Sequence, residues 1–183
     1  MTSSTTPKVN PASFARACVE AFVRGEAPPS PPAEPFYERR AACFVSIKRR
    51  NGDLRGCIGT LEPTAPSLGD EIIHNAAAAA FRDPRFYPVR PDELPDLTYS
   101  VDVLSPHEPA TIEQLDPQRY GVIVAAGARR GVLLPDLPTV RTVGEQVAIA
   151  LQKAGIAPSE PFQLARFTVD RYRESEDVAN GCC

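Results

Sequence analysis

A cysteine set between glycines is the feature of this sequence that most directly suggests chemistry. It lies in the segment Leu54-Arg-Gly-Cys-Ile-Gly-Thr60, where Gly56 and Gly59 would let a ligand or another chain approach the backbone closely. In a strand, Arg55 and Cys57 point to the same face, which would bring a guanidinium to the thiol. A nearby cation favours the thiolate, so Cys57 is a candidate covalent nucleophile. The alternative is a structural cysteine, because free cysteine is among the most buried residue types.

A second candidate site lies in the segment Asp83-Pro84-Arg85-Phe86. The proline restricts the turn, so the aspartate and the arginine are held close together. Arg85 is then able to bind an anionic ligand or a carboxylate through two hydrogen bonds, with Asp83 orienting it. The same pattern also describes a capped turn with an ordinary surface ion pair. Both interpretations stay open at the level of the sequence.

The sequence indicates neither a metal nor a cofactor. Its five cysteines stand at positions 18, 43, 57, 182 and 183 and show no C-x-x-C spacing of a zinc site. A Cys–His nucleophile pair would need one of the two histidines, His74 or His107, and we expect His74 to be a surface or capping residue. Glycine-rich nucleotide loops and the G-x-S-x-G motif of serine hydrolases do not occur.

Length and composition predict one globular domain with one hydrophobic core. The chain has 183 residues, of which 43% are hydrophobic and 23% charged, and these are ordinary values for a folded domain. With 20 Lys and Arg against 23 Asp and Glu, the net charge of -3 disfavours nucleic acid as a partner. The longest apolar run, Ala76–Phe81, is far shorter than the ~20 residues of a membrane span. The first residues lack the features of a secretory signal, so we expect a cytoplasmic protein with reduced thiols.

Hydrophobic spacing and turn residues predict an α+β fold. The predicted elements are, in order, a helix from Asn10 to Gly25, strands over 41–48 and 54–61, a helix over 68–83, strands over 97–103, 120–126 and 132–134, a helix over 142–155, and a strand over 162–169. Asn51-Gly52 predicts a type I′ hairpin turn between the first two strands. Hairpins interrupted by single helices indicate a largely antiparallel sheet.

The two ends of the chain and one proline-rich stretch are expected to lack regular structure. We expect a disordered start over residues 1–9, a folded domain over 10–173 and a flexible tail over 174–183. The tail would carry the thiols of Cys182 and Cys183. Within the domain, the prolines of residues 26–35 predict an extended connector.

Several segments together resemble one known family. They are Leu54-Arg-Gly-Cys-Ile-Gly-Thr60, Asn75-Ala-Ala-Ala-Ala-Ala-Phe-Arg-Asp-Pro-Arg-Phe86 and Gly131-Val-Leu-Leu-Pro135. In this combination they resemble the AMMECR-type domain family. The stretch Arg130–Leu137, with Thr142-Val-Gly-Glu145 and Lys153-Ala-Gly-Ile156, is most similar to the prokaryotic branch called AmmeMemoRadiSam system protein A.

The resemblance implies a fold, a site and two partner proteins, but no particular reaction. The implied fold is a single α+β domain with a mixed, largely antiparallel sheet, helices packed on it and a smaller lobe. The implied partners are a Memo-like protein and a radical-SAM protein. A cleft would be lined by the R-G-C-I-G segment. By motif match the site residues are Arg55, Gly56, Cys57, Gly59, Asn75, Asp83, Arg85 and Pro135.

Two functions follow from these observations. In the first, the chain is a cytoplasmic partner of the Memo-like and radical-SAM proteins, and its cleft binds a ligand or a partner. In the second, it is an enzyme or group carrier in which Cys57 is the covalent nucleophile. Arg55 and Arg85 would then hold a small anionic substrate, and Asp83 would orient Arg85.

Overall fold

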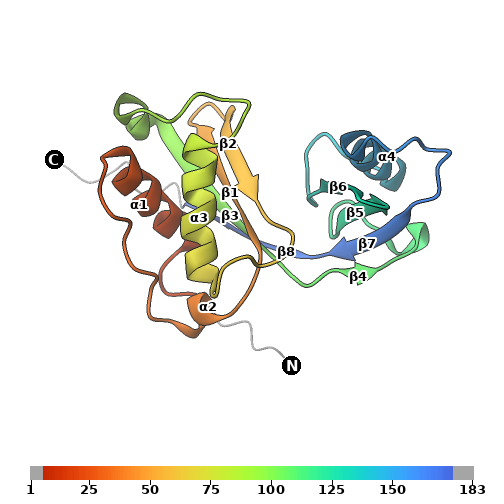
Figure 1. Cartoon of the computed structure of the whole chain (residues 1–183), viewed down its shortest axis with the longest axis horizontal. Coiled ribbons are helices and arrows are strands. Elements are labelled where there is room, and N and C mark those ends of the chain that lie inside the picture. The colour runs from red at the N-terminus through yellow and green to blue at the C-terminus, as the bar shows by residue number, and fades with distance from the viewer. Residues whose placement is uncertain (1–5, 175–183) are drawn as a thin grey trace. The chain divides into compact units, whose positions relative to one another are not determined.

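The computed structural model describes residues 6–174, which divide into two compact units (Figure 1). The first unit holds residues 6–103 and 171–174, and the second holds residues 104–170. Elements that build the first are α1 (Pro11–Val23), α2 (Pro35–Glu38), β1 (Cys43–Arg49), β2 (Leu54–Gly59), α3 (Leu68–Phe81), the 3₁₀ helix η1 (Pro91–Asp96), β3 (Leu97–Leu104) and β8 (Val169–Arg173). Those of the second are β4 (Glu108–Pro109), the 3₁₀ helix η2 (Ile112–Gln114), β5 (Gly121–Ala126), β6 (Arg129–Leu133), α4 (Val143–Ala154) and β7 (Gln163–Phe167).

The sheet of the first unit has the strand order β2-β1-β3-β8, and β1 pairs antiparallel with both of its neighbours. Alternation along β1 buries Val45 and Ile47 completely, in a core that they share with residues of α1 and α3. Helix α3 approaches the sheet closely at Gly56, which is opposite Ile47. A Cβ atom at Gly56 would lie only 2.2 Å from the carbonyl oxygen of Ala79. Only glycine fits there, so the first glycine of the R-G-C-I-G segment serves helix packing.

The ends of the predicted helices are confirmed in the first unit. Asn10 caps α1 by accepting a hydrogen bond from the N–H of Ala12 (2.8 Å), and Gly25 follows the helix with φ +73°. Ser67 caps α3 by accepting from the N–H of Asp70 (3.1 Å). These polar side chains satisfy N–H groups that the first turn of a helix leaves unpaired.

The second unit has its own sheet, of order β4-β7-β5-β6, with α4 packed on it. Helix α4 begins at a capping box, in which Thr142 Oγ1 accepts from the N–H of Glu145 (3.2 Å) and the Glu145 carboxylate accepts from the N–H of Thr142 (3.0 Å). The helix lies so close to β6 that a Cβ at Gly131 would be 1.9 Å from the carbonyl oxygen of Ala150. A separate cluster of buried residues, which includes Val124, forms the core here.

The α+β class is confirmed, and every strand pair whose register is described is antiparallel. The expected single core is instead two clusters of buried residues, one in each unit. The strand predicted over 162–169 corresponds to β7. The chain then passes from the second sheet to the first around Thr168 and continues as β8, which was not predicted. The short elements α2, η1, β4 and η2 were not predicted, and the connector over 26–35 ends in α2.

The two predicted hairpins are present, with turns that differ from the expectation. Gly52 has a φ of +93°, but Asn51 is not in the positive-φ region that a type I′ turn requires at both positions. The Asn51 side chain instead accepts a hydrogen bond from the N–H of Asp53 (3.0 Å). In the second hairpin Arg129 and Arg130 belong to β6, so the loop is shorter than predicted.

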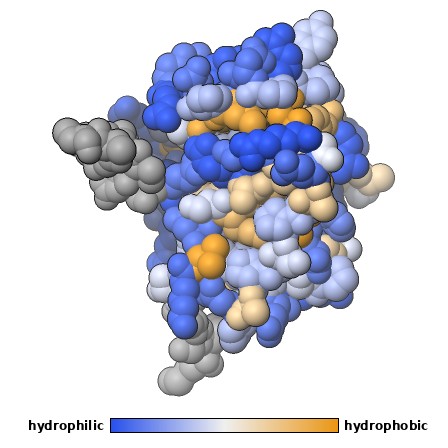
Figure 2. All heavy atoms as spheres, turned by 90° about the vertical axis from the view of Figure 1, so that its left-hand side faces the viewer, coloured by the Kyte–Doolittle hydropathy of each residue, from blue (hydrophilic) through white to orange (hydrophobic). Residues whose placement is uncertain are grey.

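None of the helices in the described part of the chain is long and apolar enough to cross a membrane. Figure 2 shows a face of mixed polarity, on which apolar residues appear between hydrophilic ones. Such scattered apolar surface is ordinary for a folded protein. The expected disordered start and flexible tail, with Cys182 and Cys183, lie for the most part outside the described residues.

Candidate binding groove

Strand β2 is an edge of its sheet, and the segment after α3 covers part of that edge. The backbone N–H of Cys57 donates to Oδ2 of Asp83 (2.9 Å). The backbone carbonyl of Cys57 accepts from Nη2 of Arg85 (3.3 Å). The Asp83 carboxylate and the Arg85 guanidinium therefore lie where a neighbouring strand would place its own C=O and N–H. The Asp83–Arg85 pair closes the edge of β2 at the residue that carries the thiol.

Asp83 is the centre of this contact. Its carboxylate also accepts from the backbone N–H (3.1 Å), Nε (3.0 Å) and Nη2 (2.7 Å) of Arg85, so the predicted contact between the two residues is present. Asp83 is only 4% exposed. Hydrogen bonds from Arg85 nevertheless hold its pKa at about 2, because they outweigh the opposing effect of burial. The carboxylate is ionised at neutral pH and holds the Arg85 side chain in place.

Arg55 does not lie beside the thiol as the alternation of a regular strand predicted. The pairing of β1 with β2 shifts between Ile47 and Lys48, so that Arg55 is an extra residue without a partner across the ladder. Its guanidinium donates to both carboxylate oxygens of Glu93 (2.9 Å each). It also donates to the carbonyl of Tyr87 (2.9 Å). The bulge therefore redirects the arginine from Cys57 to η1 and to the loop before it.

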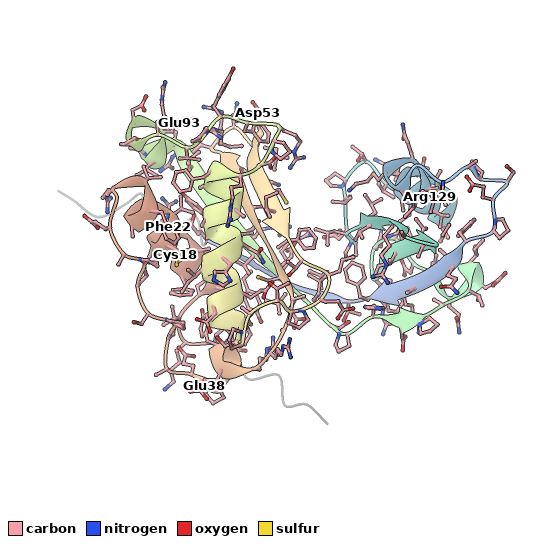
Figure 3. The ribbon with its side chains drawn as sticks, in the orientation of Figure 1. Cys18, Phe22, Glu38, Asp53, Glu93 and Arg129 are labelled. Atoms are coloured by element: carbon pink, nitrogen blue, oxygen red, sulfur yellow. The ribbon has the colours of Figure 1, made fainter. Side chains whose placement is uncertain are left out.

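Glu93 is the acidic partner that holds Arg55 in place. Hydrogen bonds from Arg55 lower the pKa of Glu93 to about 2, and the charge of Arg49 contributes in the same direction. Figure 3 shows Glu93 at the same end of the unit as Asp53, which belongs to the turn between β1 and β2. Nη1 of Arg55 is buried and has no hydrogen-bond partner among the described residues.

The thiol of Cys57 is in a different environment from the one that a reactive cysteine needs. It lies on the face of β2 opposite to Gly56, where Ser46 Oγ donates to Sγ (3.2 Å). Burial raises the pKa of Cys57 above its ordinary value, and the lowering effects of Ser46 and Arg85 do not reverse this. His74 is on α3, the helix that packs on the Gly56 side, so it does not form a dyad with the thiol.

A groove of about 670 Å³ opens beside the start of β2 and the loop that follows α3. The charged side chains that line it are four arginines and one carboxylate: Arg49, Arg55, Arg85, Arg90 and Glu93. Since Glu93 is already bound by Arg55, the groove has an excess of cationic donors. The side chains of Arg85 and Arg90 are 54% and 70% exposed. Each donates from Nε and Nη2 to an aspartate, Asp83 and Asp92 respectively, which leaves Nη1 of each without a partner among the described residues and able to bind an anion.

Aromatic side chains complete the lining of this groove. The guanidinium carbons of Arg55 and Arg85 lie 5.9 Å and 5.5 Å from the ring centre of Phe86. Tyr87 is 90% exposed, which is unusual for a large aromatic residue. Arginine and tyrosine are enriched at sites where proteins bind one another. The groove thus offers hydrogen bonds for an anion together with aromatic contact surface.

Of the eight site residues implied by the family resemblance, only Arg55 and Arg85 line the groove. The other six do not: Gly56, Cys57, Gly59, Asn75, Asp83 and Pro135. Asn75 donates from Nδ2 to the carbonyl of Cys43 (3.0 Å) and so ties α3 to β1. Gly59 leaves room for the ring of Phe44, which a Cβ would meet at 2.3 Å. Pro135 belongs to the second unit and is not among the residues that line the groove. Residues 6–174 contain no group of three or more His, Cys, Asp or Glu that could hold a metal ion.

Sequence reasoning missed five residues that line the groove, namely Arg49, Tyr87, Pro88, Arg90 and Glu93. One local signal was available for part of this set. Arg90-Pro-Asp-Glu93 has a proline at the first position of η1 and a glutamate at its third, where the Glu93 carboxylate accepts from the N–H of Arg90 (3.1 Å). The contact between Arg55 and Glu93 spans 38 residues and has no local signature.

The comparisons with known proteins agree on one family. The model of the AMMECR1 family matches residues 12–176. A protein of Thermotoga maritima is 54% identical over 142 residues, which cover 76% of this chain and 82% of that protein. A protein of Clostridium acetobutylicum is 50% identical over 142 residues, covering 78% of this chain but only 30% of the longer relative.

A solved structure has the same fold. The crystal structure of an uncharacterized protein from Pyrococcus horikoshii superposes with a TM-score of 0.82 at 30% sequence identity. The match covers 90% of this chain and 89% of the other. The sequence segments, the family model and this fold lead to the same conclusion: the chain belongs to the AMMECR1 family.

Proposed function

We propose that this chain is a binding protein that acts in the cytoplasm with a Memo-like protein and a radical-SAM protein. In this proposal it corresponds to the AmmeMemoRadiSam system protein A that its sequence resembles. The arginine-lined groove beside β2 recognises a carboxylate or a phosphate group. That group is borne either by a small anionic ligand or by the surface of one of the two partner proteins.

The observation that carries the proposal is the charge of the groove. Four arginines line it against one carboxylate, that of Glu93, which Arg55 binds. Arg85 and Arg90 also pair with Asp83 and Asp92, neither of which lines the groove. The chain as a whole has a net charge of -3, so this concentration of cations is a local feature. A guanidinium matches carboxylate and phosphate oxygens with two parallel hydrogen bonds, and this makes arginine well suited to such ligands.

The residues of the groove divide into two roles. Arg85 and Arg90 are exposed and would contact the anion, while Tyr87 would supply aromatic contact. Arg55 and Glu93 are largely buried and would hold the loop and η1 in position. Preorganised donors bind more tightly because less side-chain entropy is lost when the ligand arrives.

The alternative is an enzyme or group carrier that uses Cys57 as a covalent nucleophile. In its favour, Arg85 contacts the backbone of Cys57 and its charge lowers the pKa of the thiol. Against it, burial has the larger effect and raises that pKa. A Cys57→Ser variant tests this alternative in a host complementation assay. Loss of function with unchanged binding to the groove would favour the enzyme.

The binding proposal is tested by calorimetric titration of the purified chain with pyrophosphate, citrate, and the purified Memo-like and radical-SAM proteins of the same organism. The informative variant is Arg90→Glu, since Arg90 is 70% exposed and is paired with Asp92. The matched control is Arg24→Glu on α1, which is 53% exposed and is paired with Glu20. Both changes reverse one surface charge beside an acid.

We expect at least one of these anions or proteins to bind the wild type, with an affinity that falls as salt is raised. Arg90→Glu should weaken that binding at least about tenfold, which corresponds to about 1.4 kcal/mol, whereas Arg24→Glu should not. Binding of pyrophosphate or citrate would identify a small-ligand site, and binding of a protein alone would identify a docking site. Absence of all binding, or equal effects of the two variants, would contradict the proposal.

A further inference from the structure

The second unit contains a groove that the proposed function does not use. It has a volume of about 500 Å³ and is lined entirely by residues of that unit. It lies on the face of the sheet opposite to α4. Helix α4 packs against the face that carries Val124 and Gly131, as Figure 1 shows for α4 and the strands β5 and β6. The neighbouring residues Ala125 and Arg130 therefore point to the other face.

The register of the strands arranges the lining in two rows. In one row, Ala125 of β5 is directly opposite Arg130 of β6 on one side and Gln163 of β7 on the other. In the next row, Ile123 of β5 is opposite Ala165 of β7. Adjacent strands are about 4.8 Å apart, and residues two apart along a strand are separated by about 6.8 Å.

This arrangement forms a shelf with Arg130 and Gln163 at one end, and His107 also lines the groove. Ala125 has only a methyl group, so it leaves space between the longer side chains of Arg130 and Gln163, whose backbones are about 9.6 Å apart. Ile123 and Ala165 continue the shelf with apolar surface only. A ligand that fits both rows has a flat apolar body and a polar group at one end.

The charges of the lining determine the sign of that polar group. Arg130 is exposed, and its side chain forms no ion pair or hydrogen bond with another residue of the described chain. Its neighbour Arg129, labelled in Figure 3, donates to the carbonyl of Gly155 (2.7 Å) and pairs with Glu160. No aspartate or glutamate of residues 6–174 lines this groove, and His107 is its other titratable group. An unmatched cation without a nearby acid favours an anion.

We propose that this groove is a second binding site, which takes a small molecule with an anionic group on a flat apolar or aromatic body. Arg130 binds the anionic group, and the amide of Gln163 donates a hydrogen bond to it from across the row. The apolar body rests on Ala125, Ile123 and Ala165. The site shares no residue with the arginine groove of the first unit.

The test uses two fluorescent probes with the full chain. One is 8-anilinonaphthalene-1-sulfonate, an aromatic anion, and the other is N-phenyl-1-naphthylamine, which has a similar body without the charge. We expect both to bind the wild type. Arg130→Ala should weaken binding of the anionic probe at least tenfold and that of the neutral probe less than twofold. Gln163→Ala should weaken only the anionic probe, and Ala125→Ile should remove both by filling the shelf.

Controls separate this site from the first groove and from loss of folding. Lys153→Ala removes an exposed cation from α4, on the other side of the sheet, and Arg90→Ala removes one from the arginine groove. Neither should change binding of the anionic probe by more than twofold. Circular dichroism of each variant checks that it is folded. The inference is overturned if the wild type binds neither probe, if Arg130→Ala and Lys153→Ala act alike, or if Arg90→Ala weakens the anionic probe instead.

Discussion

The contact between Asp83 and the edge of β2 allows one stability prediction to be worked out in detail. Asp83→Asn keeps the shape of the side chain but removes the charge, and it turns one acceptor into a donor that faces the N–H of Cys57 and the guanidinium of Arg85. The pKa of Asp83 is lowered from 3.8 to about 2. At 1.36 kcal/mol for each pKa unit, this difference stabilises the folded state by about 2.5 kcal/mol at pH 7.

The dependence of this contribution on pH follows from its sign. Because the pKa is lower in the folded state, the stabilisation is complete above the pKa of the unfolded chain, near 4, and is lost as the pH falls through about 2. At pH 3 roughly half of it, about 1.3 kcal/mol, should remain. The measurement is urea unfolding of wild type and Asp83→Asn at pH 7 and pH 3.

The matched control for Asp83→Asn is Asp92→Asn. Asp92 is 67% exposed and is paired with the exposed Arg90, so Asp92→Asn should cost less than about 0.5 kcal/mol. If Asp83→Asn is no more destabilising than Asp92→Asn, the carboxylate does not fasten β2 to the end of α3. A difference between wild type and Asp83→Asn that is the same at both pH values would equally refute the reasoning.

Three further predictions concern the same unit. Gly56→Ala should destabilise the protein by about 1–3 kcal/mol in chemical unfolding, because the new Cβ would lie 2.2 Å from the carbonyl oxygen of Ala79; a neutral result would show that α3 is free to move away. Cys57 should react with iodoacetamide more slowly at pH 7.5 than a cysteine in an unfolded peptide, since burial raises its pKa; faster reaction would favour the nucleophile. Glu93→Gln should be destabilising above pH 4 and progressively less so toward pH 2, because Arg55 holds the pKa of Glu93 at about 2; a loss of stability independent of pH in this range would contradict it.

Local patterns were sufficient to predict the longer elements of the fold. The helix α4 begins and ends at positions that neighbouring residues determine, with the capping box of Thr142 and Glu145 at its start and Gly155 at its end. The first hairpin was likewise signalled by Asn51-Gly52 between two apolar runs. In each case the residues that make the contact lie within a few positions of one another.

The division into two sheets was not visible in the sequence. The run around Thr168 contains no glycine or proline at the point where the chain passes from β7 to β8. The predicted strand covers β7 and ends at residue 169, so β8, which pairs in the other sheet and extends to Arg173, was missed. Which strands pair depends on contacts between distant segments, and hydrophobic alternation within one strand does not encode them.

The candidate site was predicted in part. The contact of Asp83 with Arg85 was expected, since only Pro84 separates them. The partner of Arg55 was missed, because a bulge turned its side chain away from the face that alternation predicts. Its actual partner, Glu93, comes from a 3₁₀ helix that carries little hydrophobic signal.

We propose above that this protein binds an anionic partner in the arginine groove beside β2. The most direct test is a two-dimensional NMR titration of the ¹⁵N-labelled chain, first with pyrophosphate and then with the Memo-like protein of the same organism. We expect the resonances of Leu54, Arg85, Tyr87 and Arg90 to change, and we expect Arg90→Glu to abolish these changes. Changes confined to residues outside the groove, or no change with either, would contradict it.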